Sequence, residues 1–348
     1  MNQVFRTREI NAHTVVQGNE NLVNVAYRDP ASSLPPATVG IVTALTEEYD
    51  AVKVMFGGMT PYPVPGDPTA YATGYVPSRD PDRSHLVVAT VLPEGGNDIA
   101  ATVCTNLSRS FPSMKCVLFA GIAAGIPNLE RPGQHVRLGD VVVPWAIIDY
   151  DHVDVRPEGT QVRPGFPEPS PRMTAAVNRL LAHDRAGQHP WEPWLDTTRR
   201  PELARFRRPD DRTDVLYASD ESGRVLKHPR RKDSGHRRGV PKVHRGNIGS
   251  ADRSLRDASV RDELARRHDL RAVEMEIKGL GRAGFLNGLE WYVVRGISDY
   301  GDSRTTPLWR NYASLAAAAF TLALLGECDP FDSGHGRDAR WATTGGCP

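Results

Sequence analysis

A cluster of polar side chains follows a short apolar run near the C-terminal end of the chain. The run, residues 291–294, has the length of a buried strand, and Arg295, Ser298, Asp299 and Asp302 follow it within eight positions. In open α/β sheets, ligands bind beyond the carboxyl ends of the strands, so these side chains stand where chemistry is expected. A carboxylate there can act as a general acid or base, and Asp299 is the first catalytic candidate. A solvated turn at the end of a strand is the alternative interpretation.

Carboxylates occupy the same kind of position at two other places in the chain. Glu47 and Glu48 follow an expected strand, residues 39–42, at the start of an expected helix. Glu276 likewise lies where the expected strand at residues 271–276 leads into a helix. The helix dipole also favours carboxylates in a first helical turn, so a purely structural role fits the same pattern. The residues alone leave the two interpretations open.

Apolar runs alternate with amphipathic segments, and the elements that they predict must position these side chains. Strands are expected at residues 39–42, 85–91, 116–120, 141–144, 243–248, 271–276 and 291–294. Helices are expected from residue 46, at 99–110, 173–183 and 259–268, after 276 and at 309–325. The alternation predicts an α/β fold, a single domain with a mixed, largely parallel central sheet flanked by helices.

Three local features add to this prediction. Residues 57–82 are rich in Pro and Gly and are expected to form a loop or a loosely paired strand. Residues 121–127 are expected to form a glycine-containing turn whose backbone a ligand can approach closely. Ser259, with Asp262 and Glu263 after it, is expected to open a helix in the manner of a capping box.

The composition indicates a globular chain with some unstructured length. Of its 348 residues, 39% are hydrophobic and 24% are charged, and the formal net charge of +1 points to no particular class of partner. The four cysteines show no metal-binding spacing, and Cys104 and Cys116 lie in apolar runs, so we expect buried thiols and a cytoplasmic protein. No secretory signal segment is expected, and the longest apolar run, around residues 315–325, is too short to span a bilayer. No membrane partner is therefore expected.

Three segments carry little signal of a core. Residues 1–37 are expected to form a flexible leader, with an amyloid-type signalling motif at 13–25 as the sharper alternative, because β-branched residues mix there with Asn and Gln. The domain is expected to span 38–326, with an insertion at about 184–241. Residues 327–348 are expected to form a flexible tail.

The stretch around the end of the insertion is strongly basic. Between Arg224 and Arg245 there are nine Lys or Arg residues against one Asp. We interpret it as a solvated loop, with a nucleic-acid patch as the alternative, although no aromatic residues are interspersed for base stacking. His228, His236 and His244 lie within it without the tight spacing of metal ligands, so no metal site is predicted.

Five motifs stand in order along the chain. They are T-A-L-T-E-E-Y at 43–49, F-A-G-I-A-A-G at 119–125, L-G-D-V-V-V at 138–143, A-V-E-M-E at 272–276 and V-V-R-G-I-S-D at 293–299. Together they resemble the purine nucleoside phosphorylase and nucleosidase superfamily, whose hydrolytic members include 5′-methylthioadenosine/S-adenosylhomocysteine nucleosidase. The resemblance covers roughly residues 39–150 and 243–325.

Two further motifs narrow the resemblance. V-L-P-E-G-G-N-D-I-A-A at 91–101 and S-D-Y-G-D-S at 298–303 are similar to the phosphorylase-like domains of NACHT and related NLR-type immune receptors. Such domains look like effectors that cleave the N-glycosidic bond of purine nucleosides or nucleotides, including ATP. The resemblance therefore implies a purine nucleosidase that acts as a defence effector.

The resemblance also implies roles for the catalytic candidates. Asp299 aligns with the general acid that acts at purine N7, for which a raised pKa is expected. Glu48 aligns with the carboxylate that activates the attacking water, with Glu47 as the structural alternative. Arg295 aligns with the guanidinium that holds this carboxylate in place.

The substrate-binding residues follow from the same alignment. Glu276 matches the residue that accepts hydrogen bonds from the ribose 2′ and 3′ hydroxyls, and Met275 would lie against the sugar. Ser298 would support Asp299. The other residues expected at the base and the pocket wall are Ser254, Leu255, Gly121, Ile122 and Ala123.

The reaction class follows from a departure from the phosphorylase pattern. Residues 122–124 are Ile-Ala-Ala and offer no Arg or Ser to inorganic phosphate, so water is the expected nucleophile. If the substrate is a nucleotide, its phosphates need cations, for which Arg137, Arg304 or the basic residues 224–245 are available. No cofactor is expected.

Two other functions fit the same residues. One is housekeeping hydrolysis of methylthioadenosine or adenosylhomocysteine, which leaves the leader and the basic stretch unexplained. The other is a non-catalytic nucleotide sensor or scaffold, against which Glu48, Glu276 and Asp299 together argue. The expected partners are a small purine nucleoside or nucleotide, further copies in a dimer or hexamer, and an NLR-type or amyloid-motif partner through residues 13–25. Nucleic acid is not expected.

Overall fold

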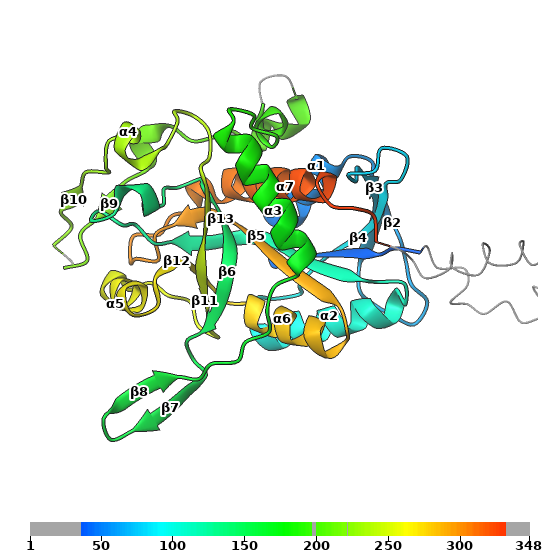
Figure 1. Cartoon of the computed structure of the whole chain (residues 1–348), viewed down its shortest axis with the longest axis horizontal. Coiled ribbons are helices and arrows are strands. Elements are labelled where there is room, and N and C mark those ends of the chain that lie inside the picture. The colour runs from blue at the N-terminus through cyan, green and yellow to red at the C-terminus, as the bar shows by residue number, and fades with distance from the viewer. Residues whose placement is uncertain (1–35, 197–199, 221, 332–348) are drawn as a thin grey trace, which may run out of the picture.

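The computed structural model describes residues 36–196, 200–220 and 222–331, and its centre is a nine-stranded sheet (Figure 1). Its strands follow the order β12-β11-β6-β13-β5-β1-β4-β3-β2. Their bounds are β1 Val39–Thr43, β2 Thr60–Pro61, β3 Tyr71–Val76, β4 His85–Val91, β5 Cys116–Gly125, β6 Val141–Asp149, β11 Val243–Ser250, β12 Leu270–Glu274 and β13 Glu290–Asp299. Every strand expected from the sequence is present, and β2 and β3 form within the stretch expected to be loop or loosely paired strand.

Parallel pairing dominates the middle of the sheet. β5 runs parallel to β1 and β13, β1 runs parallel to β4, and β11 runs parallel to β6 and β12. β3 and β2 add antiparallel strands at one edge, and β13 pairs antiparallel with β6 over a short stretch. Because β12 pairs with β5 as well as β11, five strands close into a ring. The expected mixed, largely parallel sheet is confirmed.

Helices and short hairpins complete the described part of the chain. The helices are α1 Thr46–Phe56, α2 Asn97–Ser110, α3 Pro171–Arg185, α4 Arg231–Ser234, α5 Ala258–His268, α6 Ile277–Leu286 and α7 Arg310–Gly326. Turns of 3-10 helix lie at Pro132–Gln134, Glu192–Leu195, Pro201–Phe206, Asp211–Thr213 and Pro307–Trp309. The hairpins pair β7 Val153–Arg156 with β8 Gly159–Val162, and β9 Leu216–Tyr217 with β10 Val225–Leu226.

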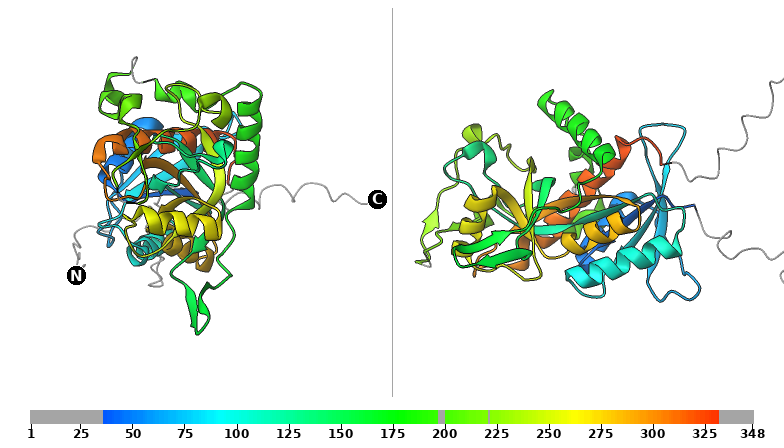
Figure 2. Two further views of the ribbon diagram at one scale, coloured as in Figure 1. Left: turned by 90° about the vertical axis from the view of Figure 1, so that its left-hand side faces the viewer. Right: turned by 60° about the horizontal axis from the view of Figure 1, so that its bottom comes forward.

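The helices cover both faces of the sheet (Figure 2). Alternate residues of a strand point to opposite faces, so Leu118 of β5 belongs to the core under α1 and α7, and Phe119 to the core under α2 and α6. Helix α7 lies close to β13 because residue 296 is glycine, where a Cβ would overlap the carbonyl group of Ala313. Gly279 likewise lets α6 meet the backbone of Asn97 in α2. The two helical layers thereby hold the central strands in place from both sides.

The segment predicted to be a glycine turn is part of a strand, and that prediction was wrong. Strand β5 continues to Gly125 because residues 121–123 pair with β13 and residues 124–125 pair with β12. The cap predicted for α5 was also wrong, since the side chain of Asp257 accepts the hydrogen bonds from the first turn of that helix. Small residues in β5 serve close packing across the strand, as described below for Gly121.

Two segments expected to lack core contacts are packed into the core. Trp191, Leu203 and Phe206 of the insertion are buried in the cluster formed with α1 and α7. Beyond residue 326, Cys328 and Phe331 are buried in the same cluster. Single apolar anchors in irregular chain have no helical or strand period, so the sequence pattern did not reveal them.

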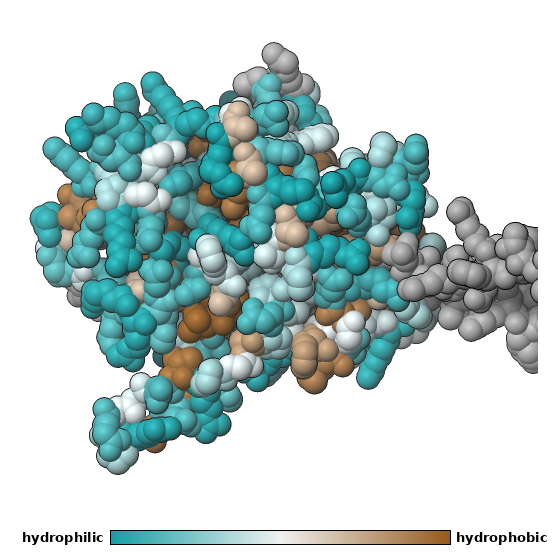
Figure 3. All heavy atoms as spheres, in the orientation of Figure 1, coloured by the Kyte–Doolittle hydropathy of each residue, from teal (hydrophilic) through white to brown (hydrophobic). Residues whose placement is uncertain are grey.

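The remaining predictions concern the two ends of the chain, membrane-spanning helices, the surface and the cysteines. The leader motif predicted at 13–25 lies outside the described residues, as do residues 332–348. Among the described helices, none has both the length and the hydrophobicity to cross a bilayer. The face in Figure 3 is mostly hydrophilic, with hydrophobic residues in small groups, one of them near the base of the β7–β8 hairpin. Cys104 and Cys116 are free and buried, as predicted.

Candidate active site

A cavity of about 270 Å³ lies where β1, β12 and β13 end. Nine of the predicted site residues line it, namely Glu48, Ile122, Ala123, Ser254, Leu255, Met275, Glu276, Ser298 and Asp299. The other two predicted site residues, Gly121 in β5 and Arg295 in β13, do not line the cavity. Segments that are far apart in the sequence therefore meet at one site.

Glu48 is held at the bottom of the cavity by backbone N–H groups. Its Oε2 accepts hydrogen bonds from the N–H groups of Ala44 (2.6 Å) and Leu45 (3.0 Å), and its Oε1 accepts one from Ile122 (2.7 Å). Burial raises the pKa of Glu48, while Arg295 and these N–H groups act in the opposite direction. The side chain of Glu47 does not line the cavity and pairs with the Thr46 hydroxyl. The geometry therefore favours Glu48 over Glu47.

Arg295 makes ion pairs with two carboxyl groups other than the one expected. Its Nη2 lies 2.5 Å from Oε2 of Glu274 and 3.3 Å from Oε2 of Glu276. The expectation that Arg295 holds Glu48 is thus corrected, since backbone N–H groups hold Glu48 instead. The guanidinium stays close to Glu48 because residue 121 is glycine: a Cβ there would overlap Arg295 Nη1 and lie 2.7 Å from Glu48 Oε1.

Glu274 is a site residue that the sequence argument missed. Its Oε2 accepts hydrogen bonds from the N–H groups of Glu276 (2.8 Å) and Ile277 (2.9 Å), at the start of α6. A-V-E-M-E contains two carboxyl groups two positions apart, and the first was not considered. Burial, and then the neighbouring Glu274, raise the pKa of Glu276 to about 8.

The polar atoms of this cluster are not all satisfied. Within the described residues, Arg295 Nε and Nη1 and Glu274 Oε1 are buried without a hydrogen-bond partner. The Arg295 guanidinium forms ion pairs with Glu274 and Glu276, and Glu48 lies close to it beside Gly121. Clusters of this kind, with raised pKa values beside a cavity, are typical of functional sites.

Asp299 lies at the other side of the cavity, half-buried at the end of β13. The hydroxyl group of Ser298 donates to its Oδ2 (2.8 Å), and the N–H group of Gly301 donates to its Oδ1 (2.9 Å). The supporting contact expected from Ser298 is present. The next residue, Tyr300, is buried and donates its hydroxyl hydrogen to Asp214 Oδ1 (2.6 Å), which ties this turn to the insertion.

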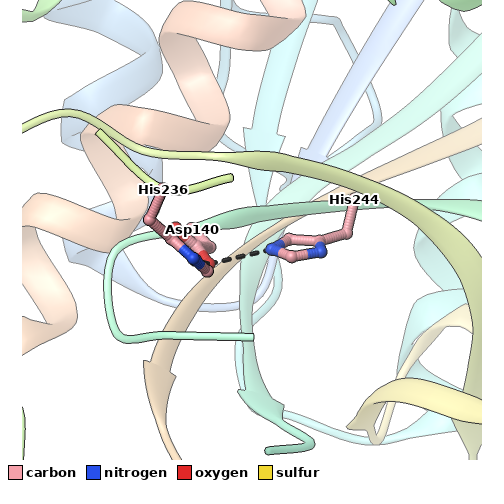
Figure 4. Close-up of side chains that lie close together, drawn as sticks. All are labelled: Asp140, His236 and His244. Carbon is pink, nitrogen blue, oxygen red and sulfur yellow. Dashed lines mark hydrogen bonds and ion pairs between the residues drawn. The ribbon is translucent and has the colours of Figure 1, made fainter. Parts of the chain in front are cut away.

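A second buried cluster joins the insertion to the sheet (Figure 4). His236 Nε2 and His244 Nε2 donate to the same oxygen of Asp140, Oδ2, at 2.7 Å and 2.9 Å. The backbone N–H groups of Arg137 and Lys242 donate to the same carboxylate at 2.8 Å and 2.9 Å. Three possible metal-ligand atoms thus lie within 4.8 Å of one another, and hydrogen bonds account for the position of each.

This cluster corrects part of the interpretation of residues 224–245 as a solvated loop, since most of the basic side chains there are exposed and the two histidines of the cluster are not. His236 and His244 are buried, and His228 accepts or donates hydrogen bonds at both ring nitrogens, to His135 Nε2 (2.9 Å) and the Asp214 carbonyl oxygen (2.9 Å). Burial, followed by the neighbouring imidazoles, lowers the pKa of His135 to about 3. Widely spaced histidines carried no sequence signal because their partners come from distant strands.

The cations at the cavity are not the predicted ones. Arg137 is bound to Asp214 at 2.7 Å, and residues 224–245 do not line the cavity. Arg304 does not line this cavity; it lines two other cavities and lies over the ring of Tyr217 at 4.7 Å. The arginines that line the cavity itself are Arg253, Arg256 and Arg310.

Two solved structures share this fold. Futalosine hydrolase of Helicobacter pylori matches with a TM-score of 0.56 and 16% identity, over 84% of this chain and 98% of that one. The 5′-methylthioadenosine/S-adenosylhomocysteine nucleosidase of Neisseria meningitidis matches with a TM-score of 0.56 and 16% identity, over 83% and 98%. At this identity the likeness concerns the fold alone.

Curated relatives are more similar in sequence. A nucleotide-binding leucine-rich repeat (NLR)-like protein of Hyaloscypha variabilis is 28% identical over 88% of this chain and 31% of its own length. The ATP nucleosidase Cap17 of Escherichia coli is 27% identical over 82% of this chain and 50% of its own length. The chain thus spans half or less of the length of these relatives. The model of the phosphorylase superfamily matches residues 38–325, and the chain belongs to that superfamily.

Proposed function

We propose that this protein hydrolyses the N-glycosidic bond of a purine nucleoside or nucleotide, with ATP among the candidates, and releases the free base. The observation that carries the proposal is the convergence of Glu48, Glu276 and Asp299 on one cavity. The similarity to Cap17, which is named an ATP nucleosidase, supports this reaction class.

In the proposed mechanism, Asp299 donates a proton or a hydrogen bond to purine N7, so that the base leaves without its full negative charge. A well-placed general acid contributes on the order of 10² to 10⁴ in rate. The hydrogen bonds from Ser298 and Gly301 orient the Asp299 carboxyl group toward this task. Its half-buried position leaves it accessible from the cavity.

The acidic side of the cavity would stabilise the sugar as the bond breaks. The ribose becomes cation-like in the transition state, and carboxyl groups fixed around it favour that charge. Glu276 would accept hydrogen bonds from the ribose hydroxyls, with Met275 against the sugar. Glu48, with its raised pKa, would take a proton from the attacking water, and Arg295 would orient Glu276.

Water is the proposed nucleophile in preference to phosphate. The N–H group of Ile122 is used by Glu48, and Arg295 is fully buried and does not line the cavity, so neither is available to a phosphate ion there.

We also propose that base release serves defence in the cytoplasm, with the chain as an effector domain of a longer assembly. The similarity to an NLR-like protein and to Cap17 supports this role. The free buried thiols of Cys104 and Cys116 are consistent with a reducing compartment. A dimer or hexamer, and an NLR-type or amyloid-motif partner through residues 13–25, remain part of the proposal.

The test is chromatographic detection of free base after incubation of the protein with ATP, AMP, adenosine and methylthioadenosine, with and without phosphate. We expect phosphate-independent release of adenine, and loss of release in the Asp299→Asn variant with an unchanged melting temperature. Release from methylthioadenosine alone would favour the housekeeping enzyme. Undiminished hydrolysis by Asp299→Asn would remove Asp299 from the mechanism, and no release from any substrate would favour a sensor or scaffold.

A further inference from the structure

We propose that Arg310, Arg256 and Arg253 form a subsite for the 5′-phosphate groups of a nucleotide at the mouth of the cavity. The inference rests on the proposed function, because it names the substrate class that the same cavity takes. It separates a nucleotide nucleosidase from an enzyme for neutral nucleosides, which the carboxyl groups alone do not do.

The three arginines reach the cavity from two segments. Arg253 and Arg256 belong to the segment between β11 and α5, which also supplies Ser254 and Leu255 to the wall. Arg310 is the first residue of α7, so the positive end of that helix lies beside the same cavity. Neither segment is part of the acidic cluster around Arg295.

The guanidinium groups of two of these arginines are not neutralised by an ion pair within the described residues. Within the described residues, neither Arg256 nor Arg310 has a carboxylate within ion-pair distance. Arg310 is half-buried and Arg256 is exposed, whereas Arg253 is paired with Asp151. Unpaired guanidinium groups with planar sets of N–H donors suit phosphate oxygens, which they can bind in bidentate fashion.

Besides the three arginines, the charged side chains that line the cavity are the carboxyl groups of Glu48, Glu274, Glu276 and Asp299. In the proposed mechanism Asp299 serves the base, Glu276 the ribose hydroxyls and Glu48 the water, so the charged lining left for the 5′ substituent is cationic. A neutral nucleoside needs no such cations. A triphosphate carries several negative charges, and the guanidinium groups that line the cavity would offset them.

The direct test compares two substrates in arginine variants. We expect Arg310→Gln and Arg256→Gln each to lower the ratio of kcat/KM for ATP to that for adenosine about tenfold, because a hydrogen bond to a charged group is worth roughly that factor. Arg266→Gln is the matched control, since Arg266 is exposed on α5 and lines a separate cavity. A ratio unchanged in both cavity variants, or lowered equally in Arg266→Gln, would overturn the subsite.

Binding measurements test the subsite even if the isolated chain turns over no substrate. Calorimetry on wild-type protein should show ATP bound at least about tenfold more tightly than adenosine, with the preference reduced in Arg310→Gln. Equal affinity for the two ligands would overturn the subsite. Adenine released from adenosine but not from ATP would do the same while leaving nucleosidase activity established, so the two proposals can fail separately.

Discussion

The Asp140 cluster and the Arg295 cluster are both buried networks of ionisable side chains, and they differ in how fully their groups are satisfied. Asp140 accepts hydrogen bonds from His236, His244 and two backbone N–H groups, and its pKa is lowered although its burial acts to raise it. Around Arg295, three carboxyl groups lie close to one guanidinium, which forms ion pairs with Glu274 and Glu276, and the pKa values of Glu48 and Glu276 are raised.

This difference is the one that we expect between a structural network and the proposed functional one. The Asp140 carboxylate, which accepts four hydrogen bonds, keeps its charge and fixes the insertion to β6 and β11. Its hydrogen-bonding capacity is used within the protein and is not left for a ligand. In the Arg295 cluster, buried polar atoms lack hydrogen-bond partners within the described residues, which is energetically unfavourable in the free protein. A substrate or water in the adjacent cavity can supply the missing hydrogen bonds. Both clusters are buried and charged, so these two properties do not distinguish them; the number of satisfied hydrogen-bonding groups does.

The largest expected effect concerns the functional cluster. Glu48→Gln should lower turnover by on the order of 10² to 10⁴, because the variant cannot accept a proton from water. Glu47→Gln is the matched control and should keep wild-type turnover, since its side chain lies outside the cavity. Initial rates of adenine release measure both. Similar losses in the two variants would mean that the first turn of α1, and not the Glu48 carboxylate, is what matters.

The structural cluster should respond in stability instead. Asp140→Ala should lower the free energy of unfolding by about 3 kcal/mol or more, because it leaves His236 and His244 buried without an acceptor. Urea denaturation gives the value. Asp154→Ala is the control, because its pair with Arg163 is exposed and should be worth less than about 1 kcal/mol. If Asp140→Ala lowers the free energy of unfolding by no more than the control does, Asp140 does not have the structural role assigned to it.

The third expected effect is a difference in pH dependence. Folding raises the pKa of Glu276 from 4.5 to about 8, chiefly through burial and Glu274, with Glu48 adding to it and Arg295 opposing it. The folded state therefore binds the extra proton, and this group's contribution to stability is full below about pH 4.5 and is lost as the pH rises toward about 8. Glu276→Gln lacks this loss, so its melting temperature should rise relative to wild type between pH 5 and pH 8.

Differential scanning fluorimetry across that range measures the effect in both proteins. Glu263→Gln is the control, since Glu263 is exposed on α5 and pairs with Arg267 on the same helix. Parallel pH profiles of Glu276→Gln and wild type would contradict the raised pKa of Glu276. They would also weaken the contrast between the two clusters.

Much of the fold and part of the site could be predicted from the sequence. Strands such as β1, β4 and β13 contain apolar runs, and that signal is local, so the positions of these strands and the largely parallel sheet were predicted correctly. The candidate carboxyl groups stand at the ends of these runs, and Glu48, Glu276 and Asp299 do line one cavity. Strand ends of a sheet lie together, which is why a local pattern could indicate a shared site.

The tertiary structure alone decided which groups are neighbours across the sheet. The partners of Arg295 depend on the register of β13 and β12 through β5, so Glu274, and not Glu48, forms its closest ion pair. The burial of His236 and His244 depends on Asp140, about a hundred positions away in the chain. Local periodicity carries no information on such pairings, because their energy arises only when distant segments have folded together and lost their water.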